Sequence, residues 1–375
     1  MSAIDIKIIA PFFDATGISQ VAREMALALY DNGINVSIAD LKDFSNFKIE
    51  PSPEEKHKLN IMQQVPLINP YVAIHMYPPA RYMNLEDKNA KANVFWHLYE
   101  TDRIPYLWRT ILNQDWINEV WVPSEFNKET FIKSKVDRDK VKVVNFGVNT
   151  TKYNPKNEKL FVKDEKSFYF SYISELKICK GYDLLLRAFY EEFVNEPNAK
   201  LIFKCSCIDD KNVVQQIAQM IGSFKKNSKA EVVLIAGTHP EEYMTKLYAT
   251  ADCFVLPTRG EGWGLGIIQS MASGVPVITS NCSAQKTFCT TNNTMLIDAP
   301  QEKIRNIDWL MHVPIQDSHE WFEPNYIQLR QKMRYAFENK KTIQAKAETA
   351  RKDVEKLDWN QIVLQVVQAL NKFNQ

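Results

Sequence analysis

The sequence lacks an excess of charge of either sign. It has 46 lysines and arginines against 45 aspartates and glutamates, which gives a formal net charge of +1 at pH 7. Proteins that bind nucleic acid usually gather basic side chains on one face or arm, and the sequence has no basic block of that kind. The composition therefore argues against a nucleic-acid partner.

Long hydrophobic runs are also missing. A membrane helix needs about 20 mostly apolar residues in a row, and no run approaches that length. The opening stretch MSAIDIKIIAPFF lacks the charged start and the apolar core of roughly 7–15 residues that mark a signal peptide. We therefore expect a cytoplasmic protein without a transmembrane segment.

Metal-binding patterns are absent as well. None of the cysteines forms a C-x-x-C pair, and all six lie beyond residue 178: Cys179, Cys205, Cys207, Cys253, Cys282 and Cys289. The one D-x-D, Asp137-Arg138-Asp139, stands in a charged stretch between an expected helix and an expected strand. We interpret it as a solvated turn. The sequence predicts no metal site and no cofactor.

Glycine is scarce, with 11 residues in 375, yet four glycines alternate within the stretch TRGEGWGLGIIQSMASGVPVITS, residues 258–280. They follow the apolar run CFVLP and lead into an expected helix from about Leu265 to Ser273. A turn between a strand and a helix points backbone N–H groups and the positive helix end at one place, which suits a phosphate. A tight turn that needs glycine only for positive φ remains the alternative.

One acid, Glu261, stands among these glycines. A carboxylate beside an anion site is electrostatically unfavourable unless it contacts something else, such as sugar hydroxyls or developing positive charge. Phosphate together with a sugar therefore fits this loop better than phosphate alone.

Apolar runs alternate with helical periodicity in two series. The first opens with a short strand at residues 7–11, the loop DATGIS and a helix that ends near Gly33. After a polar stretch at 154–167, the second opens with FYFSYIS and the helix GYDLLLRAFYEEF. This order predicts an α/β protein with two Rossmann-like parallel-sheet domains, 1–157 and 158–357. A C-terminal helix at about 358–375 is amphipathic enough to pack back on the first domain.

Several separated segments together resemble the retaining, nucleotide-sugar-dependent glycosyltransferases of family four, the group 1 glycosyltransferases. EGWGLGIIQSMASGVPVITS is similar to the signature of that family, and SYISELKICKGYDLLLRAF to the opening of its second domain. VWVPSEFNKETFIKSKVDRDKVKVVNFGVNTTKYNP is similar to the segment that closes its first domain.

The resemblance implies a GT-B fold, in which two domains face a central cleft. It implies metal-independent transfer of a hexose from a nucleoside diphosphate sugar, the donor substrate, to a hydroxyl of a glycan, lipid-linked or protein acceptor. It leaves the sugar, the nucleotide and the oligomeric state open.

The resemblance also assigns site residues. It places Glu261 on the transferred sugar, Lys180 on the donor diphosphate and His97 near the sugar, as the catalytic set. Residues 283–285 follow the strand VITS, where the family loop tends to meet the sugar or phosphate. The remaining substrate-binding positions are Thr16, Gly17, Ile235, Gly262, Trp263, Gly264 and Leu265. A solvated Lys180 and a structural His97 stay open as alternatives.

Two positions depart from the family pattern. Gln269 follows Glu261 with seven residues between them, where the family usually has a glutamate that holds the ribose. The arginine expected just ahead of Lys180 is missing, so Arg259 or Lys177 is a candidate substitute. These departures motivate an alternative function, a catalytically weak relative that serves as a binding or assembly subunit. The retained Glu261, Lys180 and Gly17 favour the enzyme.

Overall fold

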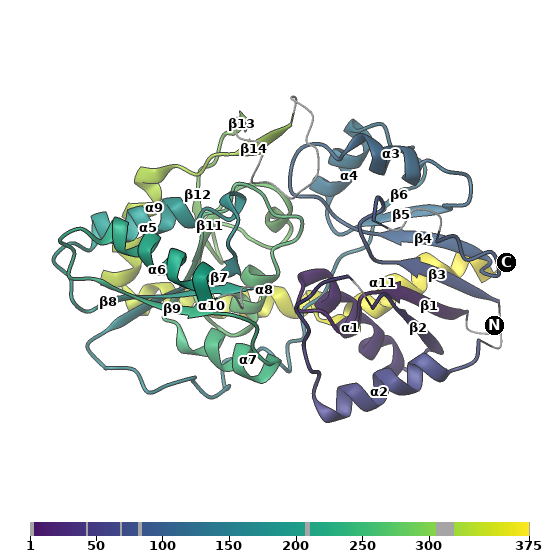
Figure 1. Cartoon of the computed structure of the whole chain (residues 1–375), viewed down its shortest axis with the longest axis horizontal. Coiled ribbons are helices and arrows are strands. Elements are labelled where there is room, and N and C mark those ends of the chain that lie inside the picture. The colour runs from purple at the N-terminus through teal and green to yellow at the C-terminus, as the bar shows by residue number, and fades with distance from the viewer. Residues whose placement is uncertain are drawn as a thin grey trace. The chain divides into compact units, whose positions relative to one another are not determined.

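The chain folds into two compact units. The structure is a computed structural model that describes residues 4–42, 44–67, 70–81, 85–206, 211–304 and 319–374. The first unit takes residues 1–148 together with 357–375, and the second takes residues 149–356 (Figure 1). Residues 149–157, which we assigned to the first domain, fall within the second unit.

The first unit is built on a six-stranded parallel sheet in the order β2-β1-β3-β4-β5-β6. The strands are β1 (Asp5–Ala10), β2 (Val36–Asp40), β3 (Tyr71–His75), β4 (Ala92–Trp96), β5 (Glu119–Val122) and β6 (Val141–Val143). The helices are α1 (Gly17–Asp31), α2 (Pro53–Gln64), α3 (Tyr106–Leu112), α4 (Glu125–Lys133), α11 (Trp359–Leu370) and the 3-10 turn η5 (Asn371–Asn374).

Local sequence explains where these elements form. Every residue of β4 is buried, as expected of a central parallel strand that is covered on both faces. Helix α2 begins at a capping box between Ser52 and Glu55, with Pro53 at its first position.

The C-terminal helix α11 packs in the first unit. The ring nitrogen of Trp359 donates a hydrogen bond to a Glu24 carboxylate oxygen of α1 at 2.6 Å, and Trp359 is 3% exposed. A Cβ at Gly147 would lie 2.5 Å from the Trp359 ring, so glycine lets the chain pass beneath the indole. The residues that follow 356 thus complete the core of the unit that contains β1.

The second unit is built on another six-stranded parallel sheet, in the order β12-β11-β10-β7-β8-β9. The strands are β7 (Phe168–Glu175), β8 (Ala199–Ser206), β9 (Glu231–Ala236), β10 (Cys253–Leu256), β11 (Val277–Ser280) and β12 (Met295–Ile297). A two-stranded antiparallel hairpin adds β13 (Gln301–Lys303) and β14 (Glu320–Phe322).

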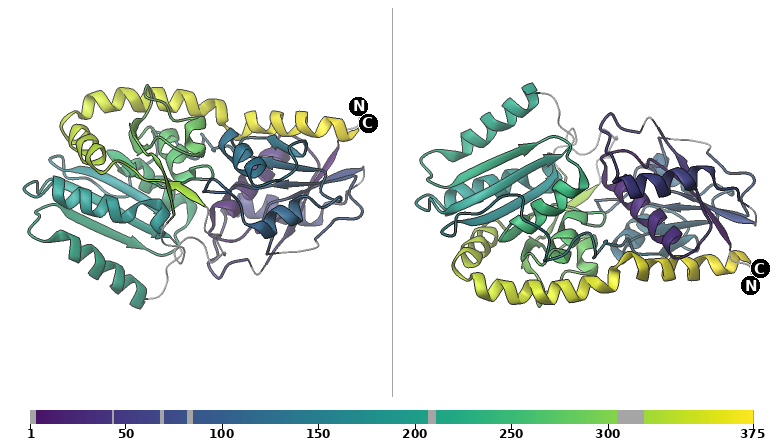
Figure 2. Two further views of the ribbon diagram at one scale, coloured as in Figure 1. Left: turned by 90° about the horizontal axis from the view of Figure 1, so that it is seen from above. Right: turned by 90° about the horizontal axis from the view of Figure 1, so that it is seen from below.

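Helices lie on both faces of this second sheet (Figure 2). They are α5 (Tyr182–Glu192), α6 (Lys211–Lys225), α7 (Glu241–Thr250), α8 (Leu265–Ala272), α9 (Tyr326–Glu338) and α10 (Lys340–Val354). Short 3-10 turns are η1 (Ile178–Lys180), η2 (Ala284–Thr287) and η4 (Glu355–Leu357). Numbered within the unit and read from β9, the strand order is 3-2-1-4-5-6, the common order of doubly wound folds. The predicted α/β class with two Rossmann-like parallel sheets is confirmed.

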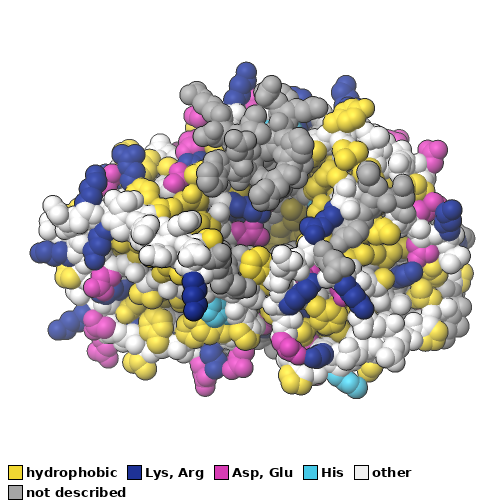
Figure 3. All heavy atoms as spheres, viewed as in Figure 1, with side chains coloured by type: hydrophobic (Ala, Val, Ile, Leu, Met, Phe, Trp, Pro, Cys, Tyr) yellow, Lys and Arg dark blue, Asp and Glu magenta, His cyan; other side chains and the backbone are white. Residues whose placement is uncertain are grey.

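The surface is mixed in charge. Acidic and basic side chains are interspersed on the face shown in Figure 3, in keeping with the net charge of +1. Within the described ranges, no helix combines the length and apolarity that crossing a bilayer requires.

Candidate functional site in the second unit

The predicted phosphate loop lies at the point where the strand order of the second sheet reverses. Strand β10 ends at Leu256, and the loop that follows it leads into α8 at Leu265. Its neighbour β7 ends at Glu175 and leads into η1, which contains Lys180. Chain connections diverge from the β7–β10 pair in opposite directions, and doubly wound folds bind their ligands at this switch point.

Lys180 and Glu261 meet at this switch point. The Lys180 Nζ donates to Glu261 Oε1 at 2.8 Å, and the two side chains are only 10% and 9% exposed. A buried ion pair gives up the hydration of both charges, so it is weak evidence for a purely stabilising role. The structure thus brings together the two residues predicted to bind the diphosphate and the sugar.

Gly181 sets the position of Lys180. Its φ is +69°, and an added Cβ would lie 1.9 Å from the carbonyl oxygen of Pro257. Only glycine tolerates both conditions. The turn after β7 therefore packs directly against the residue that follows β10, which places Lys180 beside the loop that contains Glu261.

The glycines of this loop have structural reasons of their own, and the loop also leads into an uncapped helix start. Gly264 has a φ of +100° and is the N-cap of α8, where it supplies no capping side chain. A Cβ on Gly266 would lie 3.2 Å from the Ile173 carbonyl oxygen. These two glycines have a conformational or packing reason of their own. The uncapped start of α8 is nevertheless the kind of helix end at which anions bind.

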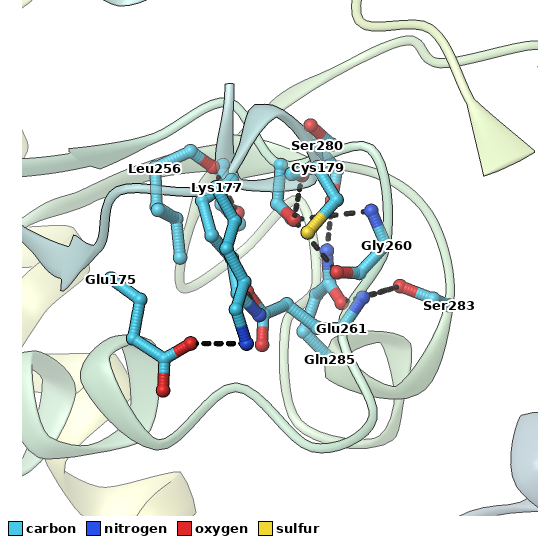
Figure 4. Close-up of polar contacts among 12 residues, drawn as sticks. Glu175, Lys177, Cys179, Leu256, Gly260, Glu261, Ser280, Ser283 and Gln285 are labelled. Atoms are coloured by element: carbon cyan, nitrogen blue, oxygen red, sulfur yellow. Dashed lines mark hydrogen bonds and ion pairs between the residues drawn. The ribbon is translucent and has the colours of Figure 1, made fainter. Parts of the chain in front are cut away.

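A turn after β11 supports the backbone of Glu261 (Figure 4). The Glu261 N–H donates to Ser283 Oγ at 3.0 Å, and the Glu261 carbonyl accepts from the Ala284 N–H at 3.2 Å. The Ser283 hydroxyl donates to Gln285 Oε1 at 2.9 Å, while Gln285 Nε2 donates to the Ser280 carbonyl. Ser283 holds this geometry at a φ of +45°, which side-chain-bearing residues rarely adopt.

Arg259, predicted to contact substrate, is fully engaged inside the protein. Its five N–H hydrogens are directed at the Asp183 and Glu323 carboxylates and the Ile178 carbonyl. Burial alone would lower the pKa of Arg259, but the two carboxylates outweigh it and raise the pKa above its ordinary value. Because no N–H is left to donate, this geometry speaks against the predicted substrate contact.

Lys177, the other candidate substitute for the missing arginine, forms an ion pair with Glu175 (Figure 4). Burial raises the pKa of Glu175, but Lys177 and Lys180 together hold it below its ordinary value. The Glu175 carboxylate is therefore ionised at neutral pH and competes with any phosphate for the Lys177 ammonium.

The other predicted residues of the second unit surround the loop and the sheet edge. Trp263 is 1% exposed and packs against Phe288 with the ring centroids 5.2 Å apart, so its side chain belongs to the core. Gln269 is buried on α8, one turn after Leu265. Ile235 lies next to the end of β9. The predicted backbone contacts of Gly262, Trp263, Gly264 and Leu265, and the ribose contact of Gln269, stay predictions.

Three predicted residues belong to the first unit, at the carboxyl edge of its sheet. Thr16 caps α1 by accepting from the Ser19 N–H at 3.3 Å, and Gly17 is the first residue of that helix. His97 follows β4, is 6% exposed and packs its ring on Trp108 at 5.1 Å. Burial lowers the pKa of His97 to about 3, so the ring is neutral at pH 7. Their contacts with a donor stay predictions.

No group of three or more histidine, cysteine or acidic side chains with the arrangement of a metal site occurs among the described residues. Asp137 accepts a hydrogen bond from the backbone N–H of Asp139 at 3.0 Å, which is the geometry of a turn.

Burial raises the pKa of the Cys282 and Cys289 thiols to about 12, so both are protonated at neutral pH. Cys207 lies outside the described residues.

Known proteins share this sequence pattern. Residues 167–312 match the family described as glycosyl transferases group 1. Mannosylfructose-phosphate synthase of Agrobacterium fabrum is 30% identical over 112 residues, 29% of this chain and 24% of its own length. D-inositol 3-phosphate glycosyltransferase of Streptosporangium roseum is 23% identical over 47% of this chain and 42% of its own length. The chain thus spans less than half the length of these relatives.

Solved structures share the fold over the whole chain. Sucrose-phosphate synthase from Thermosynechococcus elongatus has a TM-score of 0.70 at 15% identity and covers 99% of both chains. Anabaena HepE in complex with UDP-glucose has a TM-score of 0.67 at 13% identity and covers 98% of this chain and 100% of its own. The family match covers most of the second unit, which is therefore similar to the group 1 glycosyltransferases, and the solved structures show that the chain has the GT-B fold.

Proposed function

We propose that the chain is a retaining hexosyltransferase that moves a sugar from a nucleoside diphosphate sugar to an acceptor hydroxyl without a metal ion. The observation that carries the proposal is the buried Lys180–Glu261 pair at the β7–β10 switch point. It sets one ammonium and one carboxylate beside the start of α8, whose N-cap is a glycine. A diphosphate and a sugar together need these three groups.

Donor binding would exchange partners within this pair. Lys180 would leave Glu261 for a diphosphate oxygen, where an ammonium and the start of α8 stabilise the charge of the leaving group. Glu261 would then accept hydrogen bonds from sugar hydroxyls or face the positive charge that develops on the sugar ring. Both groups have already lost most of their contact with solvent before the donor arrives, which preorganises the site.

The proposed transfer step uses these positions. The bond between the sugar and the diphosphate breaks as the ring gains oxocarbenium character, and the acceptor hydroxyl enters from the same face. Its oxygen forms the new glycosidic bond, and its proton passes to an oxygen of the leaving diphosphate. Glu261 stabilises and orients the sugar in this scheme. His97, neutral at pH 7, is able to accept or donate a hydrogen bond to a sugar hydroxyl.

UDP is the first nucleotide to test, because the Anabaena structure with the same fold contains UDP-glucose. A panel of nucleoside diphosphates and their sugars is screened by thermal shift. A ligand at 100 times its dissociation constant stabilises a protein by about 2.7 kcal/mol. For a unit of this size that raises the melting temperature by about 5–11 °C. No shift with any member of the panel would contradict the proposal.

A binding or assembly subunit is the second candidate, favoured by Gln269 in place of a glutamate and by the engagement of Arg259 within the protein. A nucleotide-release assay with the donor found in the panel separates the two candidates. Turnover with an acceptor, in buffer that contains EDTA, supports the metal-independent enzyme, and NMR of the product shows whether the anomeric configuration is retained. Tight donor binding without release on any glycan, lipid-linked or peptide acceptor supports the subunit.

A further inference from the structure

Arg259 joins three segments of the second unit. Its side chain binds Ile178 and Asp183 on one side and Glu323 on the other. Its backbone repeats these links, because the Arg259 N–H donates to the Cys179 carbonyl at 2.6 Å and its carbonyl accepts from the Phe322 N–H at 2.9 Å. The turn after β7, the loop after β10 and the end of the β13–β14 hairpin therefore converge on one residue.

The two predicted catalytic groups, Lys180 and Glu261, lie close along the chain to residues of the Arg259 cluster. Lys180 stands within the segment that Arg259 holds at Cys179 and Asp183, and Glu261 follows Arg259 by two residues. A shift of Arg259 would change the position of Glu261 relative to Lys180. We propose that Arg259 is a positioning residue that fixes the geometry of the Lys180–Glu261 pair, and that it does not bind the substrate. The inference deepens the function proposed above.

The chemistry of the cluster requires arginine. The guanidinium forms two fork-shaped pairs, one with each carboxylate, and is 6% exposed beneath the Trp321 ring at 5.2 Å. Lysine keeps the charge but has three donors on one atom and cannot span both forks. The variant Arg259→Lys therefore preserves the charge of the cluster and loses its geometry.

Arg334 offers a matched control within the same unit. It donates to the Glu192 and Glu196 carboxylates and to the Glu192 carbonyl, and it packs over the Phe193 ring at 4.8 Å. This arginine is 26% exposed and joins α9 to the C-terminal end of α5 through two carboxylates, but it holds none of the predicted site residues. Arg334→Lys therefore tests the general cost of disrupting such a cluster.

The first test measures backbone hydrogen exchange in the full chain without ligand. We expect Arg259→Lys to speed exchange about tenfold or more at the amides of residues 260–265, and Arg334→Lys to leave them unchanged. Unchanged exchange in Arg259→Lys would overturn the inference. This readout needs no enzymatic activity, so a chain that transfers no sugar would contradict the proposed function and still test the role of Arg259.

The second test separates positioning from ligand contact. With UDP as the probe, we expect the dissociation constant of Arg259→Lys to rise far less than kcat falls, since no N–H of Arg259 is left to donate to a phosphate and only the displacement of Lys180 would weaken binding. With the donor that the panel identifies, kcat should fall about 100-fold, as expected for a misplaced catalytic group, and KM should change little. UDP affinity that falls as far as kcat would make Arg259 a ligand contact and overturn the inference.

Two further variants keep the test decisive if Arg259→Lys fails to fold. Asp183→Asn and Glu323→Gln retain the arginine and weaken one fork each. Each should raise loop exchange and lower kcat by less than Arg259→Lys, with UDP affinity unchanged. Wild-type exchange in both variants would contradict the inference.

Discussion

Replacing Lys180 by methionine is the most informative single change at the site. It removes the ammonium, keeps most of the side-chain volume and leaves the Glu261 carboxylate, 9% exposed, without that charge partner. Removing one member of a buried ion pair usually costs about 3–5 kcal/mol. Because about a tenth of each side chain still meets solvent, we expect the lower end, about 3 kcal/mol. The double variant Lys180→Met/Glu261→Gln removes both charges and should recover most of that loss.

The assay is calorimetry of the full chain, which can resolve a separate transition for each unit. In a unit of this size, 1 kcal/mol shifts the melting temperature by about 2–4 °C. The second unit of Lys180→Met should therefore melt about 6–12 °C below wild type, and that of the double variant close to wild type. Affinity for UDP should fall about 10- to 100-fold in both variants, because neither restores a charged donor to the phosphate.

The double variant should therefore recover thermal stability without recovering affinity for UDP. Two results would refute the reasoning that the two charges compensate each other. Either Lys180→Met melts at the wild-type temperature, or the double variant melts below Lys180→Met. Recovery of UDP affinity in the double variant would refute the assignment of Lys180 to the diphosphate.

Three more changes test other parts of the structure. Gly181→Ala should lower the melting temperature far more than Gly33→Ala. Both glycines have positive φ, which costs an alanine about 1–2 kcal/mol, but only the new Cβ at residue 181 would meet a backbone oxygen. Equal melting temperatures of the two variants would contradict the packing argument. Ser283→Ala removes the acceptor of the Glu261 N–H and should lower kcat about tenfold; a wild-type kcat in this variant would count against the role of Ser283. Burial holds the pKa of His97 near 3 in the folded chain, below its ordinary 6.5, so the unfolded chain takes up that proton first as the pH falls. Stability should therefore decline below about pH 6.5, by up to about 1.4 kcal/mol per pH unit for this group, and denaturation of His97→Gln should show a shallower pH dependence.

Most of the fold could be predicted from local sequence patterns. Apolar runs and helical periodicity alternate along the chain, and that order is enough to predict two parallel sheets with helices. The glycine loop was found for the same reason, because strand ends and glycine clusters are visible in short windows, whereas Lys180 was assigned through the resemblance to the family. Parallel strands bring such ends together, so the meeting of Lys180 with Glu261 follows from their places after neighbouring strands.

The partners of Arg259 could not be predicted in this way. Asp183 and Glu323 stand 76 and 64 residues from it along the chain, and both resemble ordinary surface acids in sequence. Only the pairing of β7 with β10 and the return of the chain through β14 bring them to one guanidinium. The resemblance pointed to residues 283–285, but the positive φ of Ser283 could not be predicted, because glycine is the residue that usually indicates that conformation in a sequence.

The two departures from the family pattern are related through charge. The family usually places an arginine and a lysine on the diphosphate and two glutamates, one on the sugar and one on the ribose, so these four positions sum to zero. This chain lacks the arginine, and Arg259 does not replace it because its donors are spent on Asp183 and Glu323. It also has Gln269 in place of the second glutamate, which leaves Lys180 and Glu261 as a neutral pair. Loss of the glutamate alone would leave excess positive charge, and loss of the arginine alone would leave a carboxylate that repels the diphosphate. The joint loss keeps the sum at zero, which is the charge balance that we expect if this chain binds a nucleoside diphosphate sugar as proposed.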